Sequence, residues 1–239
     1  MIKHFKQLEK KKVRQETMEC KIEGEKTICE YLYSTKLIKT VYASPDLYEI
    51  YRHQFPNVHF EEASEHDISR SSFSKTNTSM IALVQIPEQQ LETPTDFMLA
   101  LDDISDPGNL GTIIRICDWY GIKNIICNAQ TVDCYNPKVI SSTKGSLARV
   151  NIFYTDLEEY LEKNTDYTVY GAFLDGESIH EKKDFGEKKL LIIGNESHGV
   201  SPKLEKYISQ KITIPSFGEA ESLNAGVACG IIVDRIVGK

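Results

Sequence analysis

The stretch Ile212-Thr-Ile-Pro-Ser-Phe-Gly-Glu-Ala-Glu-Ser-Leu-Asn-Ala-Gly-Val-Ala-Cys-Gly-Ile-Ile-Val233 passes from a β-branched run, through a polar loop, into an apolar helical run. Pro215 predicts the end of a strand, because proline lacks the N–H that a β-ladder needs. Ser222 and Asn224 stand where the loop becomes a helix, and their side-chain oxygens can cap its free N–H groups. Taken alone, the stretch predicts a strand, a turn and a capped helix.

The composition is that of an ordinary globular protein. The chain has 239 residues, of which 41% are hydrophobic and 26% charged, enough for one large or two modest domains. No apolar run approaches the roughly 18–20 residues of a membrane span. The basic N-terminus has no apolar segment behind it, so we expect no signal peptide there.

The six cysteines predict reduced, buried thiols and a cytoplasmic location. None forms a Cys-x2-Cys pair and most lie in apolar runs, so we expect neither a structural zinc site nor any other metal.

The net charge of −7 is unusual for a nucleic-acid-binding protein, but the N-terminus is basic. Six cations against Glu9 alone give residues 1–14 a local charge of 6 − 1 = +5. This run suits contacts with RNA phosphates, although a solvated helix face would look the same. The predicted RNA-contacting residues are Lys3, Lys6, Lys10, Lys11, Lys12 and Arg14.

Hydrophobic periodicity predicts two α/β domains, 1–94 and 95–239, with a linker marked by Pro87, Thr93, Pro94 and Thr95. In the first domain we expect helices at 3–13, 25–33 and 45–55, a polar stretch at 64–79, and strands at 18–22, 37–43, 58–60 and 80–85. In the second we expect helices at 109–121, 137–144 and 156–163, and strands at 97–101, 122–127, 150–153, 168–174 and 190–194.

The strands of the second domain are continuously apolar, which predicts a parallel sheet covered on both faces. Ligands bind at the carboxyl ends of such strands. Three polar, glycine-bearing loops stand there, at 102–111, 194–201 and 215–222.

Common nucleotide and hydrolase motifs are absent from these loops. There is no Gly-x-Gly-x-x-Gly and no Gly-x-Ser-x-Gly, and Val200 stands where a P-loop needs lysine. An ordinary doubly wound nucleotide-binding enzyme is therefore disfavoured. Arg115 and Glu196 could together bind a charged ligand, but Arg115 could equally be a snorkelling surface side chain and Glu196 a helix cap.

Three blocks, in order, resemble the SpoU (TrmH-like) family of RNA ribose 2′-O-methyltransferases, within the SPOUT superfamily. They are Asp106-Pro-Gly-Asn-Leu-Gly-Thr-Ile-Ile-Arg115, Leu191-Ile-Ile-Gly-Asn-Glu-Ser-His-Gly-Val-Ser201 and Ile214-Pro-Ser-Phe-Gly-Glu-Ala-Glu-Ser-Leu-Asn224. The resemblance spans residues 97–238. The N-terminal segments Ile22-Glu-Gly-Glu-Lys26 and Phe73-Ser-Lys-Thr-Asn77 are similar to the L30e-like substrate-binding domain of many members.

This resemblance implies a catalytic domain with a deep C-terminal trefoil knot, a rare exception to unknotted topology. It also implies S-adenosylmethionine held mainly by backbone, and catalysis of 2′-O-ribose methylation in structured RNA, with rRNA favoured over tRNA. The implied cofactor-binding residues are Phe173, Leu174, Gly176, Ile193, Gly194, Ile214, Ser222 and Leu223. The implied catalytic residues are Asn109, Arg115, Glu196, Ser222 and Asn224. Because a guanidinium is a poor base at neutral pH, we expect Arg115 also to be an RNA-contacting residue that binds a phosphate.

The resemblance further implies a homodimer with the last helix at or near the interface. Small residues at 225, 226 and 228–230 would allow close helix packing, and packing within one chain explains them equally well. Two positions depart from the family pattern. Ser197 stands where the family often has glycine, and Ala225-Gly226 replaces the more usual valine-serine pair. We expect the passage from strand to helix to tolerate both changes. The alternative reading is a non-catalytic knotted RNA-binding protein that retains S-adenosylmethionine binding.

Overall fold

The computed structural model describes residues 2–34, 37–74, 76–77, 79–89 and 95–238. Their contacts divide the chain into two compact units. Unit 1 comprises residues 1–88 together with 133–149, and unit 2 comprises 89–132 together with 150–239. The predicted domain boundary near residue 94 lies outside the described residues and stays a prediction.

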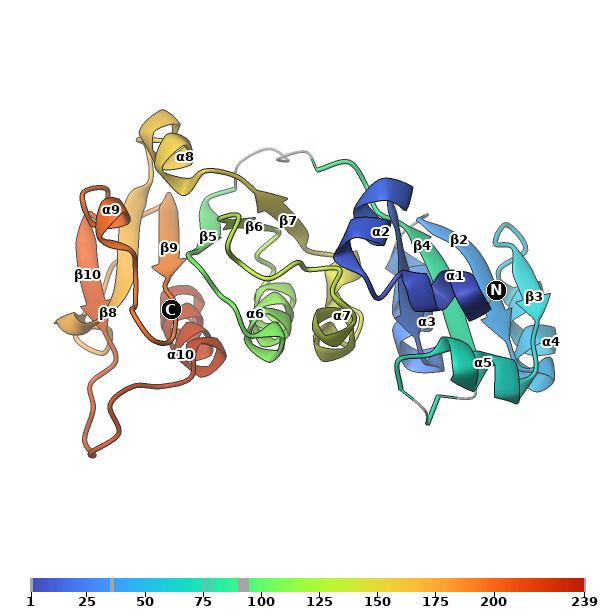
Figure 1. Ribbon diagram of the computed structural model, residues 1–239. Coiled ribbons are helices and arrows are strands. Elements are labelled where there is room, and N and C mark those ends of the chain that lie inside the picture. The colour runs from blue at the N-terminus through green and yellow to red at the C-terminus, as the bar shows by residue number, and fades with distance from the viewer. Residues whose placement is uncertain (1, 35–36, 75, 78, 90–94, 239) are drawn as a thin grey trace. The chain divides into compact units, whose positions relative to one another are not determined.

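Unit 1 is built on a four-stranded sheet of order β1-β4-β2-β3 (Figure 1). β4 runs antiparallel to β1 and β2, and β3 pairs in parallel with β2. The strands are β1 (Glu19–Glu23), β2 (Ile38–Ala43), β3 (Phe60–Glu62) and β4 (Met80–Gln85). The helices are α1 (Ile2–Gln7), α2 (Lys11–Thr17), α3 (Glu25–Ser34), α4 (Pro45–Gln54), α5 (Glu65–Ser71) and α7 (Pro137–Thr143), followed by the short 3-10 helix η1 (Ser146–Ala148).

Two predictions for unit 1 are corrected. The helix expected at 3–13 is split into α1 and α2, because Lys10 has extended dihedral angles at the N-cap of α2. The polar stretch 64–79 contains α5, which begins where the Ser64 hydroxyl accepts a hydrogen bond from Asp67 N. Ile68 is the one apolar residue in α5, too weak a periodic signal to predict a helix.

Arg14 is a third correction, because it is buried and paired instead of facing RNA. Only 3% of it is exposed. Its guanidinium donates to the carbonyls of Leu8 and Glu9, and Nη2 lies 2.6 Å from the Asp133 carboxylate. The side chain therefore ties the turn between α1 and α2 to the segment 133–149.

Unit 2 is built on a six-stranded, all-parallel sheet of order β10-β8-β9-β5-β6-β7 (Figure 1). The predicted α/β class with a parallel sheet is confirmed. Its strands are β5 (Phe97–Leu101), β6 (Asn124–Cys127), β7 (Asn151–Tyr154), β8 (Thr168–Ser178), β9 (Lys189–Ile193) and β10 (Gln210–Thr213). Its helices are α6 (Pro107–Trp119), α8 (Leu157–Lys163), α9 (Pro202–Glu205) and α10 (Ala225–Val237).

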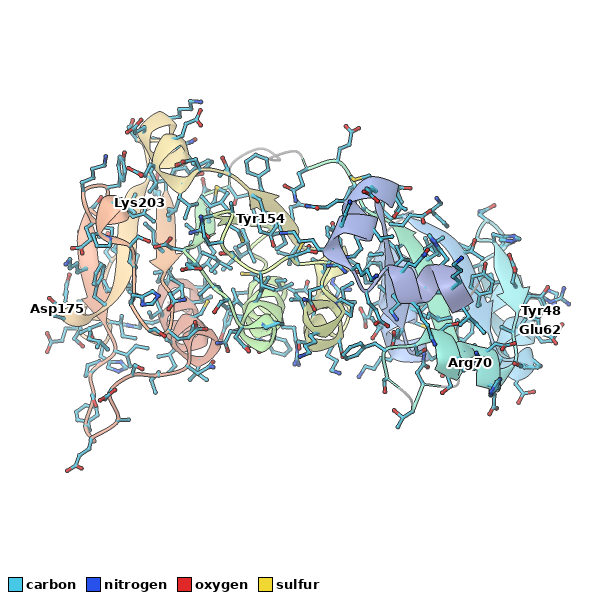
Figure 2. The ribbon with its side chains drawn as sticks, viewed as in Figure 1. Tyr48, Glu62, Arg70, Tyr154, Asp175 and Lys203 are labelled. Atoms are coloured by element: carbon cyan, nitrogen blue, oxygen red, sulfur yellow. The ribbon has the colours of Figure 1, made fainter. Side chains whose placement is uncertain are left out.

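Helices pack on both faces of this sheet, as its continuously apolar strands require. Met98, Ala100, Leu190 and Ile192 form one buried cluster with side chains of α8 and α9. Between those two helices, Lys203 lies 3.7 Å from Glu158 (Figure 2). Side chains alternate along a strand, so Leu99, Leu101 and Leu191 face the opposite side, where α6 and α10 bury Ile113, Cys117, Cys229 and Val233.

Glycines set the close contact between α6 and α10. A Cβ on Gly226 would lie 3.0 Å from Thr112 Cγ2, and one on Gly230 would lie 3.3 Å from Ile116 Cδ1. Packing within one chain therefore accounts for the small residues at these two positions. None of the described helices is long and apolar enough to cross a bilayer.

β8 is longer than the predicted 168–174 and carries an irregularity. Its pairing with β10 jumps from Lys211↔Gly171 to Ile212↔Glu177. Residues 172–176 are thus an insertion in the register of this strand pair. The apolar half of the strand was predictable, whereas residues 174–177 are exposed and have no hydrophobic pattern.

We predict that Arg14→Ala lowers the free energy of unfolding by about 3 kcal/mol, because it leaves the Asp133 carboxylate and two carbonyls without their donor. Urea unfolding followed by circular dichroism measures the loss. Lys12→Ala in the same helix is the matched control. Lys12 is exposed, and its ion pair with Glu16, at 3.7 Å, lies on the surface. We therefore expect the free energy of unfolding to change by no more than about 0.5 kcal/mol. Equal effects of the two substitutions would contradict this role of Arg14.

Candidate active site

The carboxyl ends of parallel strands meet at one edge of a sheet, and three polar loops of unit 2 stand at that edge. Residues 102–106 lead from β5 into α6, residues 194–201 from β9 into α9, and residues 214–224 from β10 into α10. The first two loops begin directly after the apolar strands β5 and β9, as the sequence predicted, and the third follows the short strand β10, in which Ile212 is the one buried residue.

Asn109 joins all three loops. Its side-chain Nδ2 donates to the Glu196 carboxylate of the second loop. Its Oδ1 accepts a 2.6 Å hydrogen bond from Asn224 Nδ2 of the third. Asn109 is 7% exposed, so both ends of a nearly buried amide are paired. The structure thus brings three of the five predicted catalytic residues together.

Side-chain caps fix the two helices that carry this network. Asp106 accepts from Asn109 N at 2.9 Å, which starts α6. Asn224 Oδ1 accepts from Gly226 N at 3.0 Å and Val227 N at 3.2 Å, which starts α10. The predicted capping role of Asn224 is confirmed. Ser222 is exposed and caps nothing among the described residues.

Asp102 forms a second set of links, which sequence reasoning missed. It is 1% exposed. It accepts hydrogen bonds from Ser201 N at 2.7 Å, from Ser201 Oγ at 2.5 Å and from Asn128 Nδ2 at 2.8 Å. These bonds hold the ends of the first two loops and of β6 together. A carboxylate directly after the apolar run 97–101 was the signal available in the sequence.

Two glycines mark places where backbones approach too closely for a side chain. A Cβ on Gly194 would lie 2.2 Å from the carbonyl carbon of Gly199 and 2.3 Å from Val200 N. A Cβ on Gly176 would lie 2.7 Å from the Lys211 carbonyl. Paired backbone bonds between Asn195 and Gly199, 2.8 and 3.0 Å long, close the second loop into a tight turn.

Arg115 stands apart from the Asn109 network. It is exposed on α6, and the described residues give it neither a hydrogen bond nor an ion pair. Its guanidinium is therefore free to bind an external anion.

Cys229 of α10 is fully buried, and burial raises the pKa of its thiol to about 12. A thiol that stays protonated at neutral pH is no nucleophile.

The predicted cofactor-binding residues lie on β8, at the end of β9, in the second loop (Gly194) and in the third loop. Leu174 is 78% exposed and Leu223 is 46% exposed. Ile193 is buried, and its carbonyl accepts from Asp102 N at 3.0 Å. Within the described chain, no intramolecular hydrogen bond uses the backbone N–H groups of residues 216–223. Exposed apolar side chains and unpaired backbone donors suit the adenosine and the methionine carboxylate of S-adenosylmethionine.

The five predicted RNA-contacting lysines lie in unit 1. Lys3 and Lys6 on α1, Lys10 in the turn, and Lys11 and Lys12 on α2 are all exposed. Their positions allow contacts with phosphate, and their role stays a prediction. The described residues contain no group of three or more His, Cys, Asp or Glu that could hold a metal ion.

Comparison with protein families identifies both parts of the chain. Residues 96–234 match the SpoU rRNA Methylase family, and residues 1–82 match the MRM3-like substrate binding domain. The chain belongs to the SpoU rRNA methylase family, as the three motifs predicted.

Named relatives and solved structures are methyltransferases. The chain is 31% identical to the 23S rRNA (guanosine(2553)-2′-O)-methyltransferase RlmP of Bacillus subtilis, over 99% of this chain and 96% of the relative. It is 32% identical to the tRNA (guanosine(18)-2′-O)-methyltransferase of Aquifex aeolicus, over 59% of this chain and 63% of the relative. An AdoMet-bound rRNA methyltransferase from Sinorhizobium meliloti superposes with a TM-score of 0.85 at 26% identity, covering 98% of this chain and 92% of that one.

These comparisons confirm the prediction that the protein is a methyltransferase with S-adenosylmethionine as cofactor. AdoMet, bound in the Sinorhizobium meliloti structure, is S-adenosylmethionine.

We predict that Asn109 and Glu196 are energetically coupled. In a double-mutant cycle of Asn109→Ala and Glu196→Ala, the coupling should be about 0.5–1 kcal/mol, since each single change removes the same charge-assisted hydrogen bond. Urea unfolding measures it. The control cycle pairs Asn109→Ala with Ser222→Ala, which share no hydrogen bond, and should show additivity. Additivity in both cycles would refute the bond.

Proposed function

We propose that the chain catalyses S-adenosylmethionine-dependent 2′-O-methylation of a ribose in structured RNA, with rRNA as the substrate class. The observation that carries this proposal is the Asn109 amide, which binds Glu196 and Asn224 and so joins the three family motifs. rRNA is favoured over tRNA because the 23S rRNA relative matches almost end to end, whereas the tRNA relative covers 59% of this chain.

In this proposal the cofactor is held by Phe173, Leu174, Gly176, Ile193, Gly194, Ile214, Ser222 and Leu223. When bound, S-adenosylmethionine supplies an electrophilic methyl group on a sulfonium. The exposed Leu174 and Leu223 would cover its apolar base, and the N–H groups of the third loop would bind its polar end. Glycines 176 and 194, where no Cβ fits, favour recognition by backbone.

Arg115 acts on the RNA. A guanidinium stays protonated at neutral pH, so it is a poor base but a good ligand for phosphate. We assign it to binding a phosphate next to the target ribose and to stabilising the negative charge that develops on the 2′-oxygen as its proton leaves. Its exposed position without an internal partner supports this role. Asn109, Glu196 and Asn224 position the loops around it.

Two finer features of the fold belong to the same proposal. The catalytic domain forms a trefoil knot in which residues 194–201 and 214–224 are threaded together. The Asn109 side chain, which contacts Glu196 of one loop and Asn224 of the other, supports this closeness of the two loops. The N-terminal domain has the L30e-like fold and recruits RNA through its exposed lysines. We place the enzyme in the cytoplasm, where its free thiols stay reduced.

The enzyme acts as a homodimer through α10 and α6. Val227, Ile231 and Val237 of α10 are 49%, 36% and 40% exposed, and Trp119 of α6 is 84% exposed. Apolar side chains grouped on neighbouring helices are typical of an interface. Gly226 and Gly230 face α6 of the same chain and therefore do not contribute to this interface.

We predict that Arg115→Ala lowers the rate of methylation by about a hundredfold or more and leaves the affinity for S-adenosylmethionine nearly unchanged. In cells, nucleotide-resolution mapping of 2′-O-methyl groups should lose one rRNA site when the variant replaces the natural chain. Calorimetry on the purified variant measures cofactor binding. Lys123→Ala, an exposed cation at the amino end of β6, is the control and should keep the site methylated.

Equal loss of methylation and cofactor binding would overturn the assignment of Arg115. A natural chain that binds S-adenosylmethionine but methylates no cellular RNA would overturn the proposed function and favour the non-catalytic alternative.

We predict that Ile231→Glu converts the dimer to a monomer, because a desolvated carboxylate at the interface has no partner. Sedimentation equilibrium measures the mass. Ile50→Glu, at a 57% exposed position in unit 1, is the matched control and should remain a dimer. A monomeric natural chain at all concentrations would refute this assembly.

A further inference from the structure

Unit 1 contains a cavity of about 340 Å³ to which the proposed function assigns no role. Its volume is at the lower end of small-molecule sites, roughly 300–1,000 Å³. One wall comes from β1, the turn into α3 and residues 73–74 and 76–77, and the other comes from α7 and Lys144, all within the same compact unit. The lining residues that matter below are Lys21, Glu23, Thr27, Phe73, Ser141 and Lys144.

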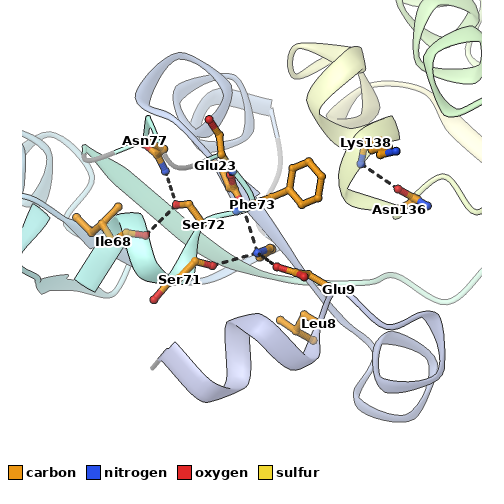
Figure 3. Close-up of polar contacts among 12 residues, drawn as sticks. Leu8, Glu9, Glu23, Ile68, Ser71, Ser72, Phe73, Asn77, Asn136 and Lys138 are labelled. Carbon is orange, nitrogen blue, oxygen red and sulfur yellow. Dashed lines mark hydrogen bonds and ion pairs between the residues drawn. The ribbon is translucent and has the colours of Figure 1, made fainter. Parts of the chain in front are cut away.

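The first wall is held by a buried ion pair (Figure 3). Lys21 is 3% exposed. Its ammonium donates to Glu9 at 3.1 Å and to the Ser71 carbonyl at 3.0 Å, and lies 3.3 Å from Glu23. The Glu23 carboxylate in turn accepts the backbone N–H groups of Phe73 and Ser74. The backbone at Phe73 and Ser74 is therefore fixed before any ligand arrives.

Phe73 is the exposed aromatic of this wall. It is 50% exposed, and the described residues give its ring no aromatic neighbour. Figure 3 shows the ring projecting on the side where Asn136 and Lys138 lie. A fixed backbone that carries an uncovered ring is suited to stack a flat ligand.

The second wall supplies positive charge and hydroxyl groups. Lys144 ends α7 in the left-handed region, with φ of 52°, and is exposed. No described carboxylate pairs with it. Ser141 on this wall and Thr27 on the other offer both donors and acceptors. A free cation beside an uncovered aromatic ring and two hydroxyl groups matches the phosphate, base face and base edge of a nucleotide.

We infer that this cavity binds one unstacked nucleotide from a single-stranded part of the RNA, with its base on Phe73 and a phosphate beside Lys144. The inference rests on the proposed function for the choice of RNA as the ligand. It adds a specific contact to the general attraction of the exposed lysines. Unit 1 then distinguishes looped RNA from a continuous helix, whose stacked bases cannot enter the cavity.

The test measures binding of the full chain to fluorescein-labelled oligouridylate and to a short RNA duplex, without S-adenosylmethionine. Phe73→Ala should weaken binding of the single strand about tenfold, the effect of losing one stacked base, and leave duplex binding unchanged. Phe73→Trp should retain binding. Tyr33→Ala, which removes another exposed aromatic of unit 1 (68% exposed), is the matched control and should change neither affinity.

Lys144→Asn removes the charge with a residue that tolerates the left-handed region. It should reduce the salt dependence of single-strand binding by about 0.7 in slope. Unchanged single-strand binding by Phe73→Ala, or an equal loss on the duplex, would overturn the inference. Equal competition by free uridine monophosphate, mole for mole, would assign the cavity to a free nucleotide and overturn RNA as its ligand. The binding assay needs no methyl transfer. It therefore tests the cavity even if the chain proves not to be a methyltransferase.

Discussion

The active-site edge of unit 2 depends on one primary amide. Glu196 requires a donor and Asn224 presents one, so the residue between them must donate and accept at once. Asparagine does both, whereas an aspartate in its place would offer no donor to Glu196 and would add a second negative charge. Because Asn109 is nearly buried, its amide has little access to water and depends on these two partners. The loops after β5, β9 and β10 are thus held together by a group that no isosteric side chain replaces.

Close backbone contacts add a second constraint beside this amide. At Gly194 the neighbouring turn leaves no space for a Cβ, so no side chain can reach out from that position. Recognition at such a site falls to backbone N–H and carbonyl groups, whose positions follow from the fold itself. Such recognition fits the glycines of the family motifs and the presence of Val200 where a P-loop has lysine. Arg115 is exposed, and the described residues give it no hydrogen bond and no ion pair, so it is accessible to an external anion.

Much of the fold was predictable because apolar strands and capped helices are local signals. The run 97–101 and the Asn224 cap of α10 follow from residue types within a few positions of each other. Several failures have a different cause, because they depend on a distant partner, whereas the missed helix α5 has too few apolar residues of its own to be predicted. The burial of Arg14 requires Asp133, which lies 119 residues along the chain. The extended β8 needs β10 beside it, and the link between Asp102 and Ser201 spans 99 residues. For the site, sequence motifs named Asn109, Glu196 and Asn224, but only the structure joined them.

The segment 133–149 belongs to unit 1, although it comes after β5 and β6 of unit 2 in the sequence. No single boundary in the sequence therefore separates the two units. It falls inside the stretch 96–234 that matches the SpoU family, yet its contacts belong to unit 1. Asp133 pairs with Arg14, and Arg149 lies 2.6 Å from Glu30. A chain cut at residue 94 would leave Arg14 buried without its carboxylate, which is costly, and would remove the α7 wall of the nucleotide cavity. Unit 1, in which residues 1–82 match the MRM3-like substrate binding domain, is therefore completed by residues from within the SpoU match, and RNA bound in the proposed cavity would contact residues from both halves of the chain.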